Sequence, residues 1–242
     1  MNKRWIGIAL VVVLVLCVLA WAFQGVLPIS PDEAPASEQD SDVDDGVVHE
    51  VTFYSNEGAV LKVDRVSNKG CAQPPQVPEM TYGSIFQSWD TDFSRVTQGM
   101  EIRPTCVEVA DRENVIAVSG GYAVGGGQAT IPIRLCGDVC VAGMDVVVRY
   151  DADALQLGAV TADGGVVYND GTAGEIHLNY VSTANTTADV DLCSLQFTAK
   201  AESGIYPISV EVVSLCAVDE ADEEVLMTPP FTVIEGNVYV VK

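Results

Sequence analysis

Apolar and polar residues alternate along most of the chain beyond residue 46. The pattern is clearest over residues 129–157, where two alternating runs flank a short turn and the second run ends in Arg149-Tyr150-Asp151. Alternation with a period of two is typical of strands that bury one face and leave the other in solvent. Similar short runs, separated by Gly, Asn and Asp, continue to Lys242, and no helical stripe of useful length interrupts them. Residues 114–242 are therefore predicted to form a β-sandwich.

A different pattern precedes these strands. Residues 5–23 form an uncharged apolar run that, as a helix, would reach about 28 Å and cross a bilayer. Lys3 and Arg4 precede the run and acidic residues follow it, so residues 1–4 are expected in the cytosol and the folded part outside the cell. The prediction is a single-pass protein of the cell membrane. A secreted protein with a cleaved signal peptide is the alternative, because Ala20-Trp21-Ala22 fits a small-x-small cleavage site.

Residues 24–46 have the composition of an extended linker. They contain three prolines and then the acidic run SEQDSDVDDG. Low hydrophobicity and charge of one sign keep such a segment unfolded. Its acids alternate as in a calcium loop, but no Gly stands at the sharp turn and no Glu closes the loop, so a solvated spacer is the favoured interpretation.

A first folded unit is predicted over residues 47–110. It opens with two strand-like runs around Ser55-Asn56-Glu57-Gly58, a pattern that favours a hairpin turn. A unit of about 60 residues is only marginally stable by itself, so a disulfide would be useful there. The side chains expected in its small core are Phe53, Leu61, Phe86, Trp89 and Phe93.

The charge of the chain narrows the range of partners. The formal net charge is −22, and only 12 of the 242 residues are Lys or Arg. Nucleic acids and anionic membrane surfaces attract basic side chains, so neither is expected to bind. The acidity suits solubility, a calcium-rich setting or a basic patch on a partner protein.

Six cysteines follow the apolar run, and an even number in an exported chain suggests disulfides. Proximity suggests the pairs Cys71–Cys106, Cys136–Cys140 and Cys193–Cys216. Connectivity cannot be deduced from sequence, and buried free thiols remain the alternative. Because no C-x-x-C pair exists and both histidines stand far from any cysteine, no metal site is predicted.

Several aromatic and glycine positions in the first unit follow a known pattern. They are Val51-Thr52-Phe53-Tyr54, Gly58, Val60-Leu61-Lys62, Phe86, Trp89-Asp90, Phe93 and Val96-Thr97. With these residues the unit resembles the Listeria–Bacteroides, or internalin B-type, repeat of bacterial surface proteins. The resemblance implies a compact β-grasp-like fold with one short helix or turn. Such repeats usually occur in tandem, and a single copy favours a spacer.

Four segments of residues 114–242 resemble the cohesin family in order and spacing. They are 120–135, 141–157 with Asp145 and Arg149-Tyr150-Asp151, 195–208, and the closing GNVYVV. The resemblance implies a nine-stranded jelly-roll sandwich and an all-β fold. It further implies that one sheet face, made by the third, fifth, sixth and eighth strands, binds a dockerin, the small calcium-dependent module of cellulosomal and other surface proteins.

Alternation on these strands predicts which residues face such a partner. The expected outward residues are Gly143, Asp145 and Val147 on the third strand, His177, Asn179 and Val181 on the sixth, and Ser194 and Gln196 on the eighth. Asp145 matches the partner-contacting Asp of the family, whereas Gly143 stands where many members carry a contacting Asn. Asp151 is expected to cap the turn before Leu155.

The expected function is therefore that of a membrane-anchored, monomeric, dockerin-binding module, without catalysis. The only histidines are His49 and His177, and no GxSxG, HExxH or Cys–His pattern occurs. No cofactor is expected, although calcium could enter through the dockerin. A carbohydrate-binding or adhesive sandwich and a structural spacer are the alternatives. The absence of Trp from the sandwich counts against sugar binding, since sugar platforms usually need exposed aromatic rings.

Overall fold

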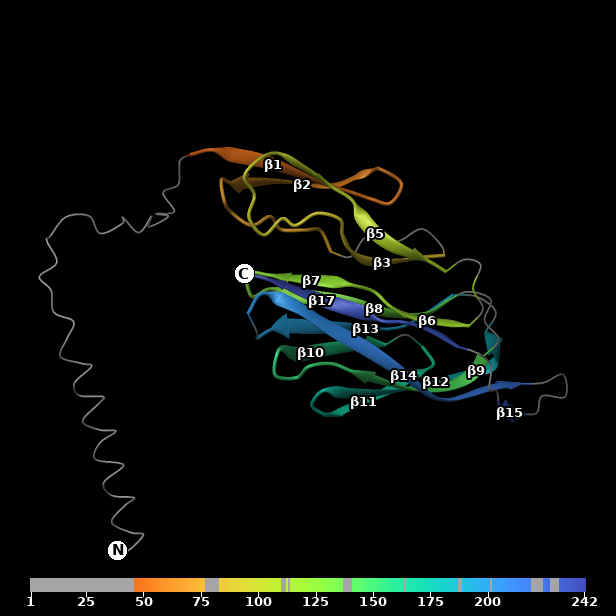
Figure 1. Ribbon diagram of the computed structural model, residues 1–242. Helices are drawn as coiled ribbons and strands as arrows, with labels where there is room; N and C mark the ends of the chain where they lie inside the picture. Colours follow the sequence, from red (N-terminus) through yellow and green to blue (C-terminus); the bar gives the residue numbers. More distant parts are fainter. Residues whose placement is uncertain are drawn as a thin grey trace, which may run out of the picture. The chain divides into compact units, whose positions relative to one another are not determined.

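The computed structural model describes most of the chain beyond residue 45. The described residues are 46–76, 83–109, 112, 114–136, 141–162, 164–186, 189–200, 202–218, 224–226 and 231–242. The expected apolar run over 5–23 and most of the linker lie outside them. Contacts divide the chain into Met1–Asp42 and Val43–Lys242, and the second part is one compact unit. Throughout the described ranges this unit is built of strands and contains no helix (Figure 1).

Five short strands form the first part of the compact unit. They are β1 (Val48–Tyr54), β2 (Val60–Ser67), β3 (Ser84–Trp89), β4 (Met100–Ile102) and β5 (Pro104–Glu108). A three-stranded sheet has the order β2-β1-β4, with β1 and β2 antiparallel and β4 parallel to β1, while β3 and β5 form a separate antiparallel pair. The β1–β2 turn ends at Gly58, whose φ of 85° is readily adopted only without a side chain.

The core of this part is aromatic. Phe53 contacts Trp89 and Phe93 edge to face, with ring centroids 5.1 and 5.5 Å apart, and Phe86 contacts Trp89 in the same way at 5.2 Å. These four side chains are buried as expected. The expectation for Leu61 is wrong, because its side chain is 40% exposed. The register between β1 and β2 shifts at Phe53/Tyr54, which leaves Leu61 in a bulge.

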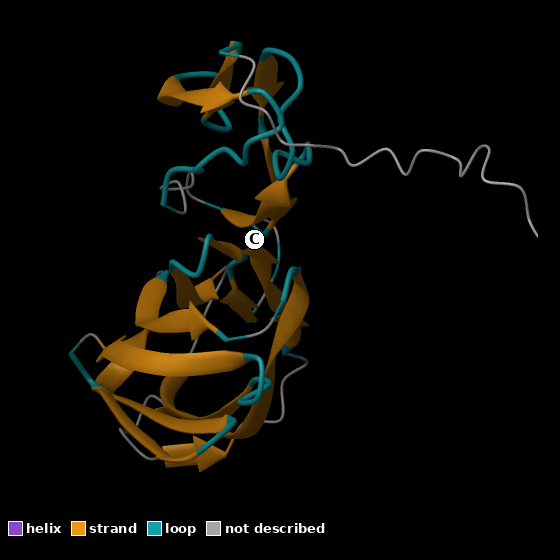
Figure 2. Ribbon diagram, turned by 90° about the vertical axis from the view of Figure 1, so that its left-hand side faces the viewer, coloured by secondary structure: helices purple, strands orange, loops and turns teal. Residues whose placement is uncertain are grey.

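Residues beyond 114 form two sheets. One has the order β10-β13-β8-β6-β16, and the other has the order β11-β12-β9-β14-β17-β7, with β15 paired to β14. The strands are β6 (Val115–Val118), β7 (Gly121–Val124), β8 (Gln128–Cys136), β9 (Val141–Arg149), β10 (Leu155–Ala162), β11 (Val166–Thr172), β12 (Glu175–Thr186), β13 (Val190–Ala199), β14 (Gly204–Val218), β15 (Glu224–Leu226), β16 (Thr232–Ile234) and β17 (Gly236–Val241). Figure 2 shows this part as layers of strands joined by loops.

The inward residues of both sheets make one apolar core. Met144, Val146 and Val148 of β9 are at most 4% exposed, and Ile131, Leu195 and Phe197 from the opposite sheet are fully buried. Burial of such a side chain stabilises the fold by roughly 1.5–3 kcal/mol. The period-two pattern thus has the expected consequence, a sandwich with alternate residues inside.

The two parts share apolar clusters. Ile85 and Val109 of the first part pack with Val115 and Ala117 of β6 on the outer side of that strand. Tyr122 of β7 packs into the aromatic core, and its hydroxyl oxygen accepts a hydrogen bond of 3.1 Å from the Trp89 backbone N–H. The first part therefore covers β6 of the five-stranded sheet and β7 of the other sheet, at one edge of the sandwich.

The cysteines differ from the disulfide expectation. Cys71, Cys106, Cys136 and Cys193 are free thiols, so the pairs Cys71–Cys106 and Cys193–Cys216 are not formed and Cys136 is not bonded to Cys140. Proximity in sequence was a poor guide, since β13 with Cys193 and β14 with Cys216 belong to different sheets. Cys140 itself lies outside the described residues.

No segment within the described ranges is a helix long and apolar enough to cross a membrane.

Candidate partner-binding face

Six of the eight predicted contact residues lie on one surface, the outer side of β11, β12, β9 and β14, here called the open face. The register between paired strands determines which of these residues are neighbours. On adjacent strands, His177 lies beside Val147, Asn179 beside Asp145 and Val181 beside Gly143. On the other side of β9, Glu211, Ser214 and Cys216 of β14 lie beside the same three β9 residues. The open face is therefore a set of parallel rows of side chains that cross three central strands.

Asp145 is the centre of a hydrogen-bonded row. Its carboxylate accepts a hydrogen bond from the Asn179 amide on one side, and one of 2.8 Å from the Ser214 hydroxyl on the other. An ionised carboxylate can only accept, so both neighbours must turn their hydrogen atoms toward it. The three side chains consequently hold one another in place on an exposed surface, and each keeps acceptor capacity toward solvent.

Arg149 joins two further rows at the end of β9. Its Nη1 lies 2.6 Å from Glu211 Oε2, and its Nε lies 3.2 Å from Glu175 Oε1. Hydrogen bonds to Glu211 and then to Glu175 raise the pKa of Arg149 above its already high ordinary value. On the rows crossing β12, β9 and β14, three carboxylates and this guanidinium leave a net negative charge, which favours a basic partner.

Exposed apolar side chains border the polar rows. Val167, Val181 and Val213 are 69%, 67% and 60% exposed. Val147 also points outward but is only 6% exposed, because neighbouring side chains cover it. Protein-binding patches combine exposed apolar side chains with polar groups that can hydrogen-bond.

Gly143 and Cys216 form a close pair at one end of the open face. A Cβ atom added at Gly143 would lie 2.6 Å from Cys216 Sγ, well inside van der Waals contact. The thiol therefore occupies the space that a side chain at position 143 would fill.

Ser194 and Gln196 were assigned to the wrong sheet. They lie on β13, which pairs with β8 and β10 in the five-stranded sheet, whereas Asp145 and Asn179 lie in the other sheet. The alternation along β13 is as expected, with Leu195 and Phe197 buried. Alternation identifies which residues face outward but carries no information about which strand lies beside which.

The place expected for β13 is taken by β14, which contributes Glu211, Val213 and Ser214 to the open face. A strict period of two through residues 208–216 would bury Ser214 and expose Leu215. A bulge between Val212 and Ser214 shifts the phase, so that Ser214 faces Asp145 and Leu215 is 7% exposed. A tract that ends in Val-Val-Ser-Leu gives no local signal of such a bulge.

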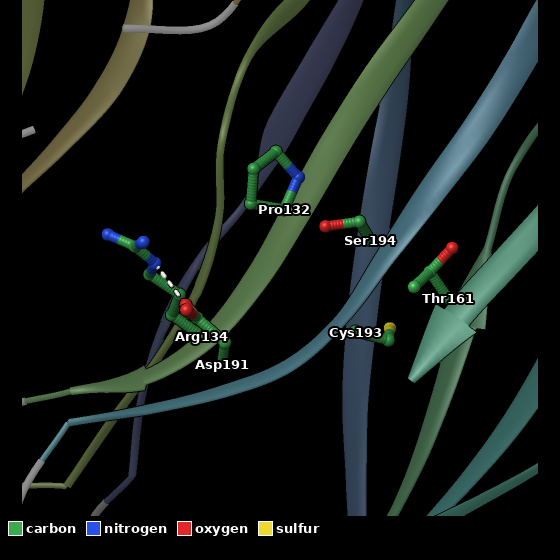
Figure 3. Close-up of a pocket in the computed structure, with 6 residues that line it drawn as sticks. All are labelled: Pro132, Arg134, Thr161, Asp191, Cys193 and Ser194. Atoms are coloured by element: carbon green, nitrogen blue, oxygen red, sulfur yellow. Dashed lines mark hydrogen bonds and ion pairs between the residues drawn. The ribbon is translucent and has the colours of Figure 1, made fainter. Parts of the chain in front are cut away.

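A small cavity lies on the other sheet and is distinct from the open face. It has a volume of about 160 Å³, and its lining includes Thr161, Ser194 and Cys193. Arg134 and Asp191 also line it, and Arg134 Nε lies 2.5 Å from Asp191 Oδ1. Figure 3 draws this ion pair as a dashed line. Burial raises the pKa of Cys193 to about 12, so this thiol is protonated and a poor nucleophile at neutral pH.

Two further predictions concern local chemistry. Asp151 Oδ1 accepts hydrogen bonds from the N–H groups of Asp153 and Ala154, at 2.9 and 3.2 Å, so it caps the turn before Leu155 as expected. Within the described ranges, no group of three or more Asp, Glu, His or Cys side chains is placed to hold a metal ion.

Cohesin domains are among the solved structures to which this chain is similar. No family model matches the sequence, and no curated protein matches it. Among solved structures, the seventh ScaB type I cohesin of Pseudobacteroides cellulosolvens is 17% identical, with a TM-score of 0.47, over 52% of this chain and 90% of its own. A non-cellulosomal cohesin of Archaeoglobus fulgidus is 13% identical, with a TM-score of 0.43, over 54% of this chain and 92% of its own.

A third structure is a type I cohesin of Clostridium thermocellum, solved in complex with a dockerin. It is 20% identical, with a TM-score of 0.44, over 54% of this chain and all of its own. At such identities, and at TM-scores below 0.5, these similarities decide nothing about what the sandwich binds.

Proposed function

We propose that residues 114–242 are a cohesin-type module that binds a dockerin-bearing protein through the open face. The observation that carries the proposal is the combination of an uncovered sheet surface with an ordered polar centre. Asp145, which matches the family's partner-contacting Asp, is held by Asn179 and Ser214, and apolar side chains exposed by 60% or more surround it. The choice of a dockerin as the partner rests on the four sequence segments that resemble cohesins.

The opposite sheet is a poorer candidate surface. Its β6 side is occupied by the first part of the compact unit, through the packing of Ile85 and Val109 on Val115 and Ala117. Its remaining outward residues include Thr130, Gln196 and Thr198, which are small or neutral and are partly buried. We therefore assign partner binding to the open face alone.

The test is direct binding to dockerin modules encoded in the same genome, measured by calorimetry with calcium and with a chelator. We expect a 1:1 complex that needs calcium, because the dockerin requires calcium for its own fold. Val181→Glu should weaken binding at least ten-fold, since it places a carboxylate on an exposed apolar contact of an already acidic face.

The matched control is Thr198→Glu, which adds the same charge to the outer side of β13 on the other sheet. It should leave the affinity within about two-fold. Equal losses in both variants, or no binding of any dockerin, would contradict the assignment. Binding of soluble glycans, together with no binding of calcium-loaded dockerin, would instead favour the alternative function of a sugar-binding sandwich.

We further propose that residues 5–23 anchor the chain in the cell membrane with the folded part outside, and that the internalin B-type unit over 47–110 acts as a spacer. The charge distribution around the apolar run supports this orientation. Protease added to intact cells should cleave the folded part while the protein sediments with membranes. A signal peptide removed at Ala22 would instead release the protein into the medium.

A further inference from the structure

The outer side of the β2-β1-β4 sheet is a second exposed surface, here called the hairpin face. Its inner side packs on the aromatic core through Val51 and Phe53, so the alternate residues point to solvent. Across β1 and β2 the outward residues pair as Val48 with Ser67, Glu50 with Arg65, Thr52 with Val63 and Tyr54 with Val60.

Apolar side chains are concentrated on this hairpin. Val48, Val60 and Val63 are 58%, 57% and 48% exposed, and the neighbouring Val47 and Leu61 are 45% and 40% exposed. Among the described residues, no other pair of adjacent strands exposes as many large hydrophobic side chains. Val60, Leu61 and Val63 lie together at one end of the hairpin, and Val47 and Val48 lie at the other end, beyond the Glu50–Arg65 row. Exposed apolar groups rimmed by polar residues are typical of an interaction site.

The charges on the hairpin face balance one another. Glu50 lies directly across from Arg65, and Arg103 lies 3.3 Å from Glu101, with its guanidinium 4.4 Å from the centre of the Tyr54 ring. Two acids and two bases leave no net charge, although the whole chain carries −22. A second copy can therefore approach this surface without the repulsion that it would meet over an acidic one.

We propose that the hairpin face binds a second copy of the chain in a two-fold symmetric dimer. In such an interface the same patch must be complementary to itself. With the axis parallel to the strands and through the middle of the Glu50–Arg65 row, Glu50 of each copy faces Arg65 of the other, Val63 faces Thr52 and Val60 faces Tyr54. This proposal replaces the monomer expected from sequence.

The first test measures the oligomeric state of the full chain, kept soluble in a nonionic detergent, by sedimentation velocity over a hundred-fold range of concentration. We expect a concentration-dependent dimer, with a dissociation constant raised at least ten-fold by Val63→Glu. Val167→Glu, at a more exposed valine of the open face, is the matched control and should leave the constant unchanged. A monomer at every concentration, or equal effects of both variants, overturns the proposal.

The second test uses charge exchange. Glu50→Arg and Arg65→Glu each place like charges at the dimer axis, so each variant alone should be monomeric. A mixture of the two should dimerise again, because one copy then presents two arginines and the other two glutamates. Failure of the mixture to dimerise, with both variants folded by circular dichroism, overturns the proposal.

The proposal is independent of the dockerin-binding function. Dockerin affinity of Val63→Glu should equal that of the unmodified chain, because the hairpin face and the open face share no residue.

Discussion

The thiol of Cys216 determines what position 143 can carry. Cys216 and Gly143 are register partners on β14 and β9, and the thiol stands where a methyl group at position 143 would go. The side chain that fits at position 143 thus depends on the residue at position 216, and the reverse. This kind of dependence between two strands far apart in sequence is invisible in a local pattern.

We expect Gly143→Ala to destabilise the protein by about 1–3 kcal/mol, the usual cost of overpacking. Cys216→Ala removes the sulfur atom, so the double variant should recover most of that loss. Urea denaturation of the two single variants and the double variant measures the coupling. Additive effects in the double variant would show that the two side chains do not compete for space.

At the scale of strands, the bulge in β14 explains how one strand serves both the core and the open face. The extra residue Val213 lets Leu215 stay inside while Ser214 reaches Asp145. Beyond the bulge the partner residues on β9 continue in step, as Leu215 with Met144 and Cys216 with Gly143. The bulge therefore takes up the extra residue of β14 and keeps the remaining residues in register with β9.

Deletion of Val213 should leave the fold intact. The shortened strand keeps Val212 and Leu215 inside, so we expect the melting temperature to fall by only a few degrees. Deletion of Asn179 is the comparison, because β12 pairs with β9 without interruption from Glu175 to Val181. That deletion would turn Tyr180 outward, and the variant should lose most of its cooperative melting transition, recorded by circular dichroism. Similar melting of both variants would contradict this role of the bulge.

Alternation predicted individual strands well and their arrangement poorly. It places Ile176, Leu178 and Tyr180 of β12 in the core, where all three are buried. It also gives the correct phase for β13. However, β14 takes the place in the sheet of β9 that was expected for β13. Which strands pair is decided by contacts between distant segments, and single bulges, as at Leu61 and Val213, break the period without a sequence signal.

At the scale of the whole compact unit, Tyr122 joins the first part to the sandwich. Its ring stacks on Tyr239, with centroids 4.7 Å apart, and also packs against Phe93 at 5.4 Å. Burial raises the pKa of Tyr122 to about 12. Tyr122 thus packs into the aromatic core and onto the outer side of β17, and so links the first part to the sandwich.

Tyr122 should make stability sensitive to alkaline pH. Below pH 10 its hydroxyl is neutral in both folded and unfolded chains, so its full contribution is present. Between pH 10 and about 12 the unfolded chain ionises first, and the free energy of unfolding should fall by roughly 1–2 kcal/mol after allowance for solvent screening.

Tyr122→Phe isolates this effect because the other titrating groups are unchanged. The variant loses the hydrogen bond from the Trp89 N–H, so it should be about 1 kcal/mol less stable at pH 8. That difference should shrink between pH 10 and 11.5 in urea titrations. A constant difference over this range would contradict the assigned pKa.

Gly120 lies at a close approach between the backbones of the two parts. Its N–H donates a 2.8 Å hydrogen bond to the Phe86 carbonyl, and an added Cβ would overlap the Gln87 carbonyl oxygen. Because that oxygen belongs to the backbone, it cannot turn away as a side chain would. The sandwich and the first part must therefore separate or deform to admit any larger residue.

We expect Gly120→Ala to loosen this junction and to lower the free energy of unfolding by about 2–3 kcal/mol. Fluorescence of Trp89, which lies beside the junction, should shift to longer wavelength before the sandwich unfolds. Gly164→Ala is the control, since an added Cβ there meets no atom within 4 Å. An unshifted emission spectrum in Gly120→Ala would show that the junction absorbs the extra methyl group.

The buried thiols of Cys136 and Cys193 have a consequence for the reactivity of the sandwich. Burial raises the pKa values of Cys136 and Cys193 to about 12, so at pH 7 only about one molecule in 100,000 carries either sulfur as thiolate. Reaction with oxidants, or disulfide exchange with neighbouring chains, requires that rare thiolate form. Neither of these two sulfur atoms therefore takes part readily in thiol exchange while the fold is closed.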